Sequence, residues 1–391
     1  MDYLLTDEQK LLQELCRKIA EEKIAPVAKE LDEKEEFPWQ IIKILAQSDL
    51  FGIFIPQQYG GLLNLPEGKN IGGVLDLCIA TEELSRACGG IAVCYAASAL
   101  GTFPIILYGN KEQKERYLPD LAKGGKLAAF AITEPEAGSD ASSIKTTAVK
   151  KDGYYVLNGI KHFITNGGEA DIYVVIAMTD KTKGPRGASA FIVEKGTTGF
   201  NFGKKEEKLG IRASVTRELI FDNCKVPEKN LLGKEGLGFI ITMKTFDVSR
   251  PGVAAQAVGI AQGALDLALK YAKERQQFGK SISSFQGIQW MLADMATQVE
   301  AARALVYAVA RMIDNGNTSV SKESAMAKLF ASDVAMRVTT DAVQIFGGYG
   351  YMRDYPIEKY MRDAKITQIY EGTNQIQRNI IFLQLIKELA K

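Results

Sequence analysis

The chain has 391 residues, a hydrophobic fraction of 46% and a formal net charge of +1. This length allows two or three domains, and this composition is ordinary for a globular protein with a sizeable core. The 48 basic and 47 acidic residues nearly cancel, and no basic tail or extended Lys/Arg cluster occurs, so a nucleic-acid partner is not expected.

The cysteines and the first residues bear on the compartment. The cysteine count is five, an odd number, and no C-x-x-C pair occurs, which argues against a disulfide framework and for a reducing environment. Acidic residues appear from Asp2 onward and no apolar segment of a signal peptide follows. We therefore expect a cytoplasmic protein, although a mitochondrial matrix protein would look the same after processing.

Residues 1–125 are predicted to form a helical domain. Thr6 followed by Gln9 resembles a capping box at the start of the first helix. The stretch 87–110 has no charged residue and is long enough to span a bilayer. Its glycines and Pro104 instead favour a buried core helix that ends before the proline, and no membrane span. Further helical patterns cover 39–49, 72–87, 91–103 and 111–122.

The centre of the chain changes character. Short apolar runs are separated by turn signals such as Asp152-Gly153 and Asn158-Gly159, and no helix-length repeat alternates with them. Residues 126–230 are therefore predicted to form an antiparallel β domain, with strands that include 154–157, 173–177, 190–193 and 219–221. Residues 231–391 return to long helical patterns, at 236–275, 286–314 and 321–346, which indicate a four-helix bundle. The expected fold class is α+β multidomain.

Several common catalytic sets are missing from the sequence. His162 is the single histidine, so Ser-His-Asp and Cys-His arrangements and a zinc site are all poorly supported, and we expect no metal. His162 itself is more simply read as a surface or supporting residue. There is no G-x-G-x-x-G segment for a Rossmann fold, and no Walker A motif.

A glutamate near the C-terminus is the leading candidate base. Residues 369–378 read Ile-Tyr-Glu-Gly-Thr-Asn-Gln-Ile-Gln-Arg, which places the Glu371 carboxylate beside a glycine hinge at Gly372. A carboxylate so placed can act as a general base if its surroundings keep it reactive. An isolated Glu-Gly-Thr would more often cap the following helix, so the assignment depends on companion motifs.

Four such motifs occur upstream, in order. They are Ala131-Ile-Thr-Glu-Pro-Glu-Ala-Gly-Ser-Asp140, Phe163-Ile-Thr-Asn-Gly-Gly168, Arg275-Gln-Gln-Phe-Gly279 and Gln344-Ile-Phe-Gly-Gly-Tyr-Gly350. With the Tyr370-Glu-Gly-Thr373 segment they resemble the acyl-CoA dehydrogenase family, most closely its short- and medium-chain branch. The likeness covers essentially the whole chain, and the layout of the family is helical domain, β domain, helical bundle.

The resemblance implies a reaction. Glu371 abstracts the α-proton of an acyl-CoA thioester, and FAD accepts the β-hydride at N5, which gives the trans-2-enoyl-CoA. The Glu371 N–H and a flavin ribityl hydroxyl would polarise the thioester carbonyl. Burial should raise the pKa of Glu371 toward the working pH. Electrons would pass to electron-transfer flavoprotein. Alternatives on the same frame are an acyl-CoA oxidase, an enoyl-CoA reductase and a catalytically silent scaffold.

The resemblance also assigns cofactor contacts. Those expected within one subunit are Phe130, Ile132, Thr133, Ser139, Phe163 and Thr165, with Thr373 and Gln375 behind the base. Those expected from a neighbouring subunit are Arg275, Gln277, Phe278, Gln344, Gly347 and Gly348. FAD binding would then need at least a dimer, and the usual state in the family is a homotetramer, a dimer of dimers.

Substrate contacts follow from the same comparison. They are Tyr95, Ser139, Phe246, Asp247, Ser249, Arg250, Tyr370 and Gly372. Arg250 is interpreted as lying at the start of a long helix, where the N-terminus attracts anions such as the phosphates of CoA. The segment 91–100 is rich in small residues, so a branched, cyclic or medium-length acyl group would fit. It has no arginine to clamp a glutaryl carboxylate and no acid to serve as a second base. An extra loop at 62–70 has no assigned role.

Overall fold

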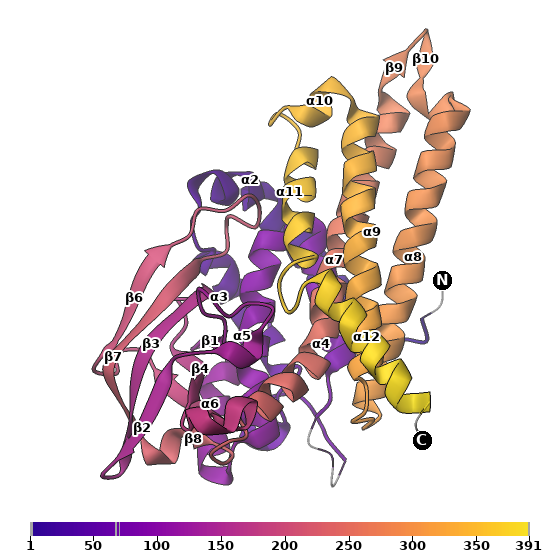
Figure 1. The fold of residues 1–391 in the computed structure, drawn as a ribbon. Helices are drawn as coiled ribbons and strands as arrows, with labels where there is room; N and C mark the ends of the chain where they lie inside the picture. Colours follow the sequence, from indigo (N-terminus) through magenta and orange to yellow (C-terminus); the bar gives the residue numbers. More distant parts are fainter. Residues whose placement is uncertain (1–2, 67–68, 70, 390–391) are drawn as a thin grey trace.

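A computed structural model describes residues 3–66, 69 and 71–389, in which three parts follow one another along the chain (Figure 1). The first part is helical. Its helices are α1 (Asp7–Ile19), α2 (Ala25–Lys34), α3 (Trp39–Gln47), α4 (Val74–Ala87), α5 (Gly89–Tyr108) and α6 (Lys111–Ala122). The predicted capping box at Thr6 and Gln9 is confirmed, because each residue's side chain bonds the other's backbone N–H.

The prediction that the core helix ends before Pro104 is wrong. Helix α5 runs through Pro104 to Tyr108. A proline inside a helix forgoes one backbone hydrogen bond. Here Phe103, Ile105 and Ile106 around it are all buried, and this packing outweighs the missing bond. By length and composition α5 and the later helix α7 (Gly238–Glu274) could each cross a membrane, but both lie mostly inside the fold.

The second part is a twisted sheet. Its strands are β1 (Ala128–Ala131), β2 (Thr147–Lys151), β3 (Tyr154–Thr165), β4 (Ile172–Met178), β5 (Ala188–Glu194), β6 (Phe200–Lys205), β7 (Thr216–Pro227) and β8 (Leu231–Leu232). They lie in the order β6-β7-β3-β2-β4-β5-β8, and β1 pairs with β4. The prediction of a purely antiparallel domain needs correction, because β4 runs parallel to both β1 and β2. The β2–β3 hairpin, inserted between β1 and β4, lets the latter two strands run in the same direction.

The third part is a helical bundle. Its elements are α7 (Gly238–Glu274), β9 (Gln276–Gln277), β10 (Lys280–Ser281), α8 (Gln286–Asp314), α9 (Ser321–Phe346), α10 (Gly348–Tyr351), α11 (Ile357–Thr367) and α12 (Asn374–Leu389). Helix α9 packs against α7, α8, α11 and α12, and α7 also packs against α4 and α5 of the first part. The loop between α11 and α12 therefore faces the junction of the three parts (Figure 1).

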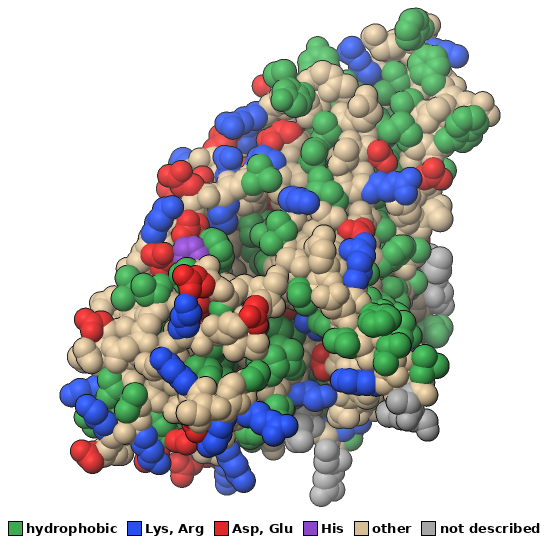
Figure 2. All heavy atoms as spheres, viewed as in Figure 1, with side chains coloured by type: hydrophobic (Ala, Val, Ile, Leu, Met, Phe, Trp, Pro, Cys, Tyr) green, Lys and Arg blue, Asp and Glu red, His purple; other side chains and the backbone are tan. Residues whose placement is uncertain are grey.

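Two ends of the bundle expose hydrophobic side chains (Figure 2). At the β9–β10 hairpin the Phe278 ring is 92% exposed. On α12 the exposed side chains are Phe382, Leu383, Leu385, Ile386 and Leu389. Contiguous exposed apolar surface of this kind marks sites of association. The extra loop begins with an exposed Leu62 and a Gln57 N–H bond to the Leu63 carbonyl; residues 67, 68 and 70 lie outside the described part.

Candidate active site

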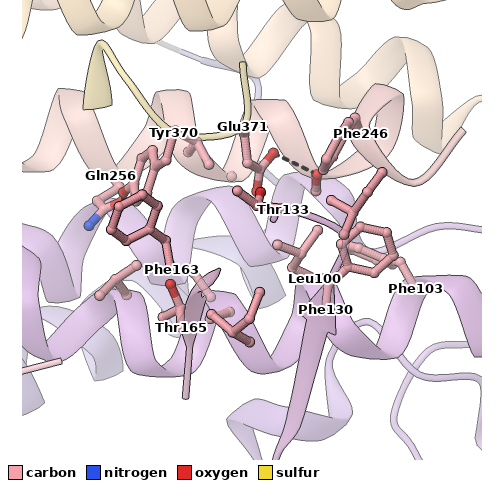
Figure 3. A pocket seen from close by; sticks show the side chains of 18 of the residues that line it. Leu100, Phe103, Phe130, Thr133, Phe163, Thr165, Phe246, Gln256, Tyr370 and Glu371 are labelled. Carbon is pink, nitrogen blue, oxygen red and sulfur yellow. Dashed lines mark hydrogen bonds between the residues drawn. The ribbon is translucent and has the colours of Figure 1, made fainter. Parts of the chain in front are cut away.

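A cavity of about 120 Å³ lies where the three parts meet. The lining residues come from α4 and α5 (Leu77, Val93, Ala96, Ala97, Leu100, Phe103), from the ends of β1 and β3 (Phe130, Ile132, Thr133, Phe163, Ile164, Thr165), from α7 (Phe246, Ser249, Gly252, Val253, Gln256) and from the α11–α12 loop (Tyr370, Glu371). Among these described lining residues Glu371 is the one charged side chain. The cavity is thus an apolar chamber with a single carboxylate (Figure 3).

Glu371 is held in an unusual backbone conformation. Its φ is +50°, and Gly372 after it has a φ of +90°. That positive φ favours glycine at position 372, and a Cβ there would also displace the Gln377 side-chain nitrogen, which would lie 2.8 Å away. Two left-handed residues in succession turn the chain sharply between α11 and α12. The turn directs the Glu371 side chain into the cavity (Figure 3).

Among the residues that the structure describes, one side chain donates a hydrogen bond to the Glu371 carboxylate. Ser249 on α7 donates its hydroxyl to Oε2 at 2.8 Å. Burial raises the pKa of Glu371 above its ordinary value, while the Ser249 bond and the charges of Arg250 and Lys328 oppose that rise. A carboxylate whose pKa is raised by burial is a better proton acceptor than one in water.

Three side chains hold the carbonyl groups of the strained turn. Arg250 Nε lies 3.4 Å from the Glu371 carbonyl oxygen, and Gln377 Nε2 donates to the Glu371 and Gly372 carbonyls at 3.1 and 2.8 Å. Lys328 Nζ donates to the Gly372 carbonyl at 2.8 Å. The backbone N–H groups behave differently: the Glu371 N–H has no acceptor among the described residues. It is therefore available to a ligand oxygen.

The opposite wall has an aromatic ring and two hydroxyl groups. Phe163 has a φ of +59° at a bulge in the β3–β7 pairing, and its ring remains 59% exposed. The Thr133 and Thr165 side chains point into the same space, and neither hydroxyl bonds any residue that the structure describes (Figure 3). A flat ring with a polar edge would stack on Phe163 and bond the threonines, so this wall fits an isoalloxazine.

The strand behind that wall is fixed by a buried ion pair. Lys161 is fully buried, and its Nζ lies 2.7 Å from Glu134 Oε1 and 2.9 Å from the Ile132 carbonyl oxygen. The His162 N–H donates to the Thr133 carbonyl at 2.8 Å. These bonds link β3 to the segment after β1, so Thr133 and Phe163 are held in register.

Some predicted contacts do not come to this cavity. Tyr95 is fully buried among Phe51 and Phe54, and its hydroxyl donates to the Leu50 carbonyl at 2.9 Å. Its predicted contact with the substrate is therefore wrong for this cavity; in a helix, residues 96, 97 and 100 take the lining face instead. Asp247 is also turned away, because it accepts from Ser321 Oγ at 2.7 Å.

Arg250 needs a different explanation from the one expected. Helix α7 begins at Gly238, so Arg250 lies in the helix interior and no helix N-terminus is close to it. Its side chain is 3% exposed and bonds the Glu371 carbonyl. The sequence predicts Arg250 at a helix N-terminus that attracts the phosphates of CoA. That reason is wrong, because the helix begins more than three turns before Arg250.

The remaining predicted residues fall in two groups outside the cavity lining. Ser139 lies on an exposed turn, and Thr373 and Gln375 follow the base at the start of α12. The second group is at the far end of the bundle, where Arg275 lies over the Tyr349 ring at 5.3 Å. This group comprises Arg275, Gln277, Phe278, Gln344, Gly347 and Gly348, and the structure places all of it on the surface at the β9–β10 and α10 end (Figure 1).

His162 lies in a small polar cluster. Its Nδ1 is 3.1 Å from Glu218 and its Nε2 is 3.7 Å from Glu206, while Lys204 pairs with Glu206 at 3.2 Å. The side chains of His162, Glu206 and Glu218 are close enough to one another to hold a metal ion. The imidazole also packs edge-on against Phe163, with ring centroids 3.9 Å apart. The supporting position expected for His162 agrees with this packing.

Sequence reasoning missed Lys328 and Gln377. In 321–346, residues 324, 328, 331, 335, 338 and 342 form one helical stripe of small and apolar residues, broken by the lysine. A charged residue on such a stripe is rarely buried without a specific partner. The stripe was therefore a usable signal for Lys328. No comparable signal marks Gln377, because the site of its bonds depends on the turn conformation at Gly372.

Family models match all three parts of the chain. The matches are to the acyl-CoA dehydrogenase N-terminal domain over residues 6–125, the middle domain over 129–224 and the C-terminal domain over 236–386. The chain belongs to the acyl-CoA dehydrogenase family. It is accordingly an oxidoreductase whose cofactor is FAD, and the Phe163 wall with its two threonine hydroxyls is where the flavin fits.

Relatives of known type span the whole chain. Butyryl-CoA dehydrogenase from Megasphaera elsdenii is 49% identical with a TM-score of 0.94, over 99% of this chain and 100% of that one. A chain in a solved structure of the electron transferring flavoprotein of Acidaminococcus fermentans is 52% identical with a TM-score of 0.94, over 98% and 99%. Acryloyl-CoA reductase (NADH) from Anaerotignum propionicum is 51% identical over 99% of this chain and 96% of its own length.

Proposed function

We propose that this acyl-CoA dehydrogenase oxidises short-chain acyl-CoA thioesters, such as butyryl-CoA, with Glu371 as the base. The observation that carries the proposal is the geometry at Glu371: one half-buried carboxylate points into an apolar chamber opposite the wall that fits the flavin. The likeness to butyryl-CoA dehydrogenase supports the acyl length. The chamber also has no arginine among its described lining residues, which disfavours a second carboxylate on the substrate.

The residues of the chain divide the work. The Glu371 carboxylate removes the α-proton of the thioester, and its unpaired backbone N–H donates to the thioester oxygen, where negative charge develops. Ser249 fixes the carboxylate through its 2.8 Å bond. Phe163, Thr133 and Thr165 would hold the flavin, which supplies the acceptor for the β-hydride. Loss of one proton and one hydride gives the trans-2-enoyl thioester.

Apolar side chains exclude water from the reaction. Leu100, Phe103, Phe130 and Phe246 gather beside the carboxylate, and the Phe130 and Phe246 rings meet edge to face at 5.8 Å (Figure 3). In such a chamber an electrostatic interaction is stronger than in water. Burial therefore serves both the basicity of Glu371 and the stabilisation of developing charge on the thioester.

We further propose that electrons pass to electron-transfer flavoprotein and that the enzyme is a cytoplasmic homotetramer. The likeness to a chain from an electron transferring flavoprotein structure supports the first part. The exposed Phe278 hairpin and the apolar face of α12 support association. The six residues at the hairpin end would then complete the FAD site of a neighbouring subunit. They are Arg275, Gln277, Phe278, Gln344, Gly347 and Gly348.

A panel of acyl-CoAs tests the reaction and the chain length together. The FAD-loaded protein is titrated without oxygen with butyryl-, octanoyl-, isovaleryl- and glutaryl-CoA, and flavin absorbance is followed. Bleaching that is strongest with butyryl-CoA is the expected result. Strong preference for glutaryl-CoA would contradict the proposed substrate class.

The reverse reaction is a second candidate, because a relative that shares 51% of its residues is an acryloyl-CoA reductase that uses NADH. The same titration, followed by chemical reduction of the flavin and addition of an enoyl-CoA, decides between the two directions. A flavin that no saturated acyl-CoA bleaches, but that is reoxidised by an enoyl-CoA after chemical reduction, would favour the reductase direction.

A further inference from the structure

Lys328 is a buried cation without an ion-pair partner in the described part of the chain. Its side chain on α9 is fully buried. Nζ donates to the Gly372 carbonyl at 2.8 Å and to Asn374 Oδ1 at 2.9 Å, and no carboxylate lies within ion-pair distance among the described residues. Burying an ammonium group is costly unless something compensates for it. The question is therefore what the buried Lys328 ammonium group contributes at this position.

The two groups that Lys328 contacts flank the turn that holds the base. Gly372 follows Glu371 directly, and Asn374 is the first residue of α12. Asn374 is itself fixed, because its Nδ2 donates to Ser332 at 2.9 Å and to Asp333 at 2.7 Å. Lys328 therefore links the left-handed turn to α9 through a set of buried and partly buried bonds.

The charge of Lys328 also acts on the base. Glu371 is the largest of the charges that oppose deprotonation of Lys328, and Lys328 in turn opposes the burial-driven rise in the pKa of Glu371. Burial lowers the pKa of Lys328 to about 7. The charged groups that act on Lys328 are Glu371 on the turn, Arg250 on α7 and Asp333 on α9. Arg250 in turn lies 3.9 Å from Asp247, and Asp333 pairs with Arg378 on α12 at 3.1 Å.

We propose that Lys328 is a positioning residue for the reaction: through its bond to the Gly372 carbonyl it holds the turn so that Glu371 faces the substrate, and its positive charge favours the ionised carboxylate. The inference rests on the proposed role of Glu371. Arg250 is a second cation near the base, but it bonds the Glu371 carbonyl from the other side of the turn. Because Lys328 and Glu371 act on one another's charge, the ionisation of each depends on that of the other.

The test separates charge from geometry. Lys328→Gln keeps a donor for the Gly372 carbonyl and removes the charge; Lys328→Arg keeps the charge. Rates of anaerobic flavin reduction by butyryl-CoA are measured against pH in both. In the Gln variant the acid limb should move to higher pH and the rate at pH 6 should fall about tenfold, with KM within about twofold. The Arg variant should keep the acid limb of the wild type.

A matched control lies on the same helix. Lys322 pairs with Glu388 near the exposed end of α9, and Lys322→Gln should leave the pH profile unchanged. A Lys328→Gln profile that coincides with the wild type would overturn the inference. If Glu371→Gln also remained active, the proposed function itself would fail, whereas an inactive Glu371→Gln with an unshifted Lys328→Gln would overturn the role of Lys328 alone.

A second measurement leaves Lys328 in place, in case its variants do not fold. Protein with labelled lysine ε-carbons is titrated by NMR in the wild type and in Glu371→Gln. One lysine should titrate near pH 7 in the wild type, and its midpoint should move to lower pH in Glu371→Gln, because a neighbouring anion is lost. A lysine midpoint that does not respond to Glu371→Gln contradicts the proposed coupling.

Discussion

Two fully buried lysines lie on opposite sides of the active-site cavity. Lys161, on the β-domain side, donates to the Ile132 carbonyl and pairs with Glu134 at 2.7 Å. Lys328, on the bundle side, donates to the Gly372 carbonyl and has no carboxylate so close. Burial lowers the pKa of Lys161 to about 8 and that of Lys328 to about 7.

The difference lies in the counter-charge. Glu134 accepts backbone bonds from Lys145 and Thr146 as well as the Lys161 bond, so it stays ionised and the pair is a permanent brace behind Thr133. The anion with the largest effect on the pKa of Lys328 is the base itself, which changes its protonation state during the reaction. The same arrangement of ammonium and carbonyl is thus structural on one side of the cavity and tied to the chemistry on the other.

The largest effect is expected on the permanent pair. Glu134→Gln would leave the Lys161 amine buried without a counter-charge, and its pKa, about 8 in the wild type, would fall further. Breaking a buried pair in this way costs about 3–5 kcal/mol, so the free energy of unfolding in urea should fall by about that amount. Glu136→Gln breaks the exposed pair with Lys145 and should leave the free energy of unfolding nearly unchanged. Equal losses in the two variants would mean that the Lys161–Glu134 pair braces nothing.

The lowered pKa of Lys328 should make the free energy of unfolding depend on pH. Its pKa is about 7 in the folded protein and about 10.4 when unfolded, so in that window the unfolded chain binds more protons and stability rises with pH. Relative to Lys328→Met, the free energy of unfolding of the wild type should rise between pH 7 and 10, by up to about 1.4 kcal/mol per pH unit. If the difference in free energy of unfolding between the two proteins does not change with pH, the pKa of Lys328 is not lowered in the folded protein.

The smallest effect is expected at Tyr95, which lies outside the comparison. Tyr95→Phe removes its hydroxyl bond to the Leu50 carbonyl and should lower the free energy of unfolding by about 1 kcal/mol. KM and kcat for butyryl-CoA should not change, because the ring packs in the core of the helical domain. A marked rise in KM would restore Tyr95 to the substrate site.

Much of the fold could be predicted from the sequence because the patterns are local. The capping box at Thr6, the turn signals of the central part and the long helical repeats of the bundle depend on neighbouring residues. The continuation of α5 through Pro104 could not be predicted, because it depends on burial by distant residues. The parallel pairing of β4 could not be predicted either, because it depends on strand order. Tertiary packing overrides local propensity in both cases.

The site was predictable only in part for a related reason. Phe163, Thr133 and Glu371 stand in recognisable motifs, and the structure brings them to one cavity with Ser249. Lys328 and Lys161 stand in no motif that points to chemistry, and their importance comes from the carbonyls that the fold places beside them. Sequence motifs therefore identify the groups that face a ligand better than the groups that position them.

The central claim is that Glu371 takes the α-proton. It is tested most directly by rapid anaerobic mixing of FAD-loaded wild type and Glu371→Gln with butyryl-CoA, with flavin absorbance as the readout. The wild type should bleach, and Glu371→Gln, with its flavin still bound, should bleach about 10²- to 10⁴-fold more slowly. Bleaching of Glu371→Gln at the rate of the wild type would contradict the account.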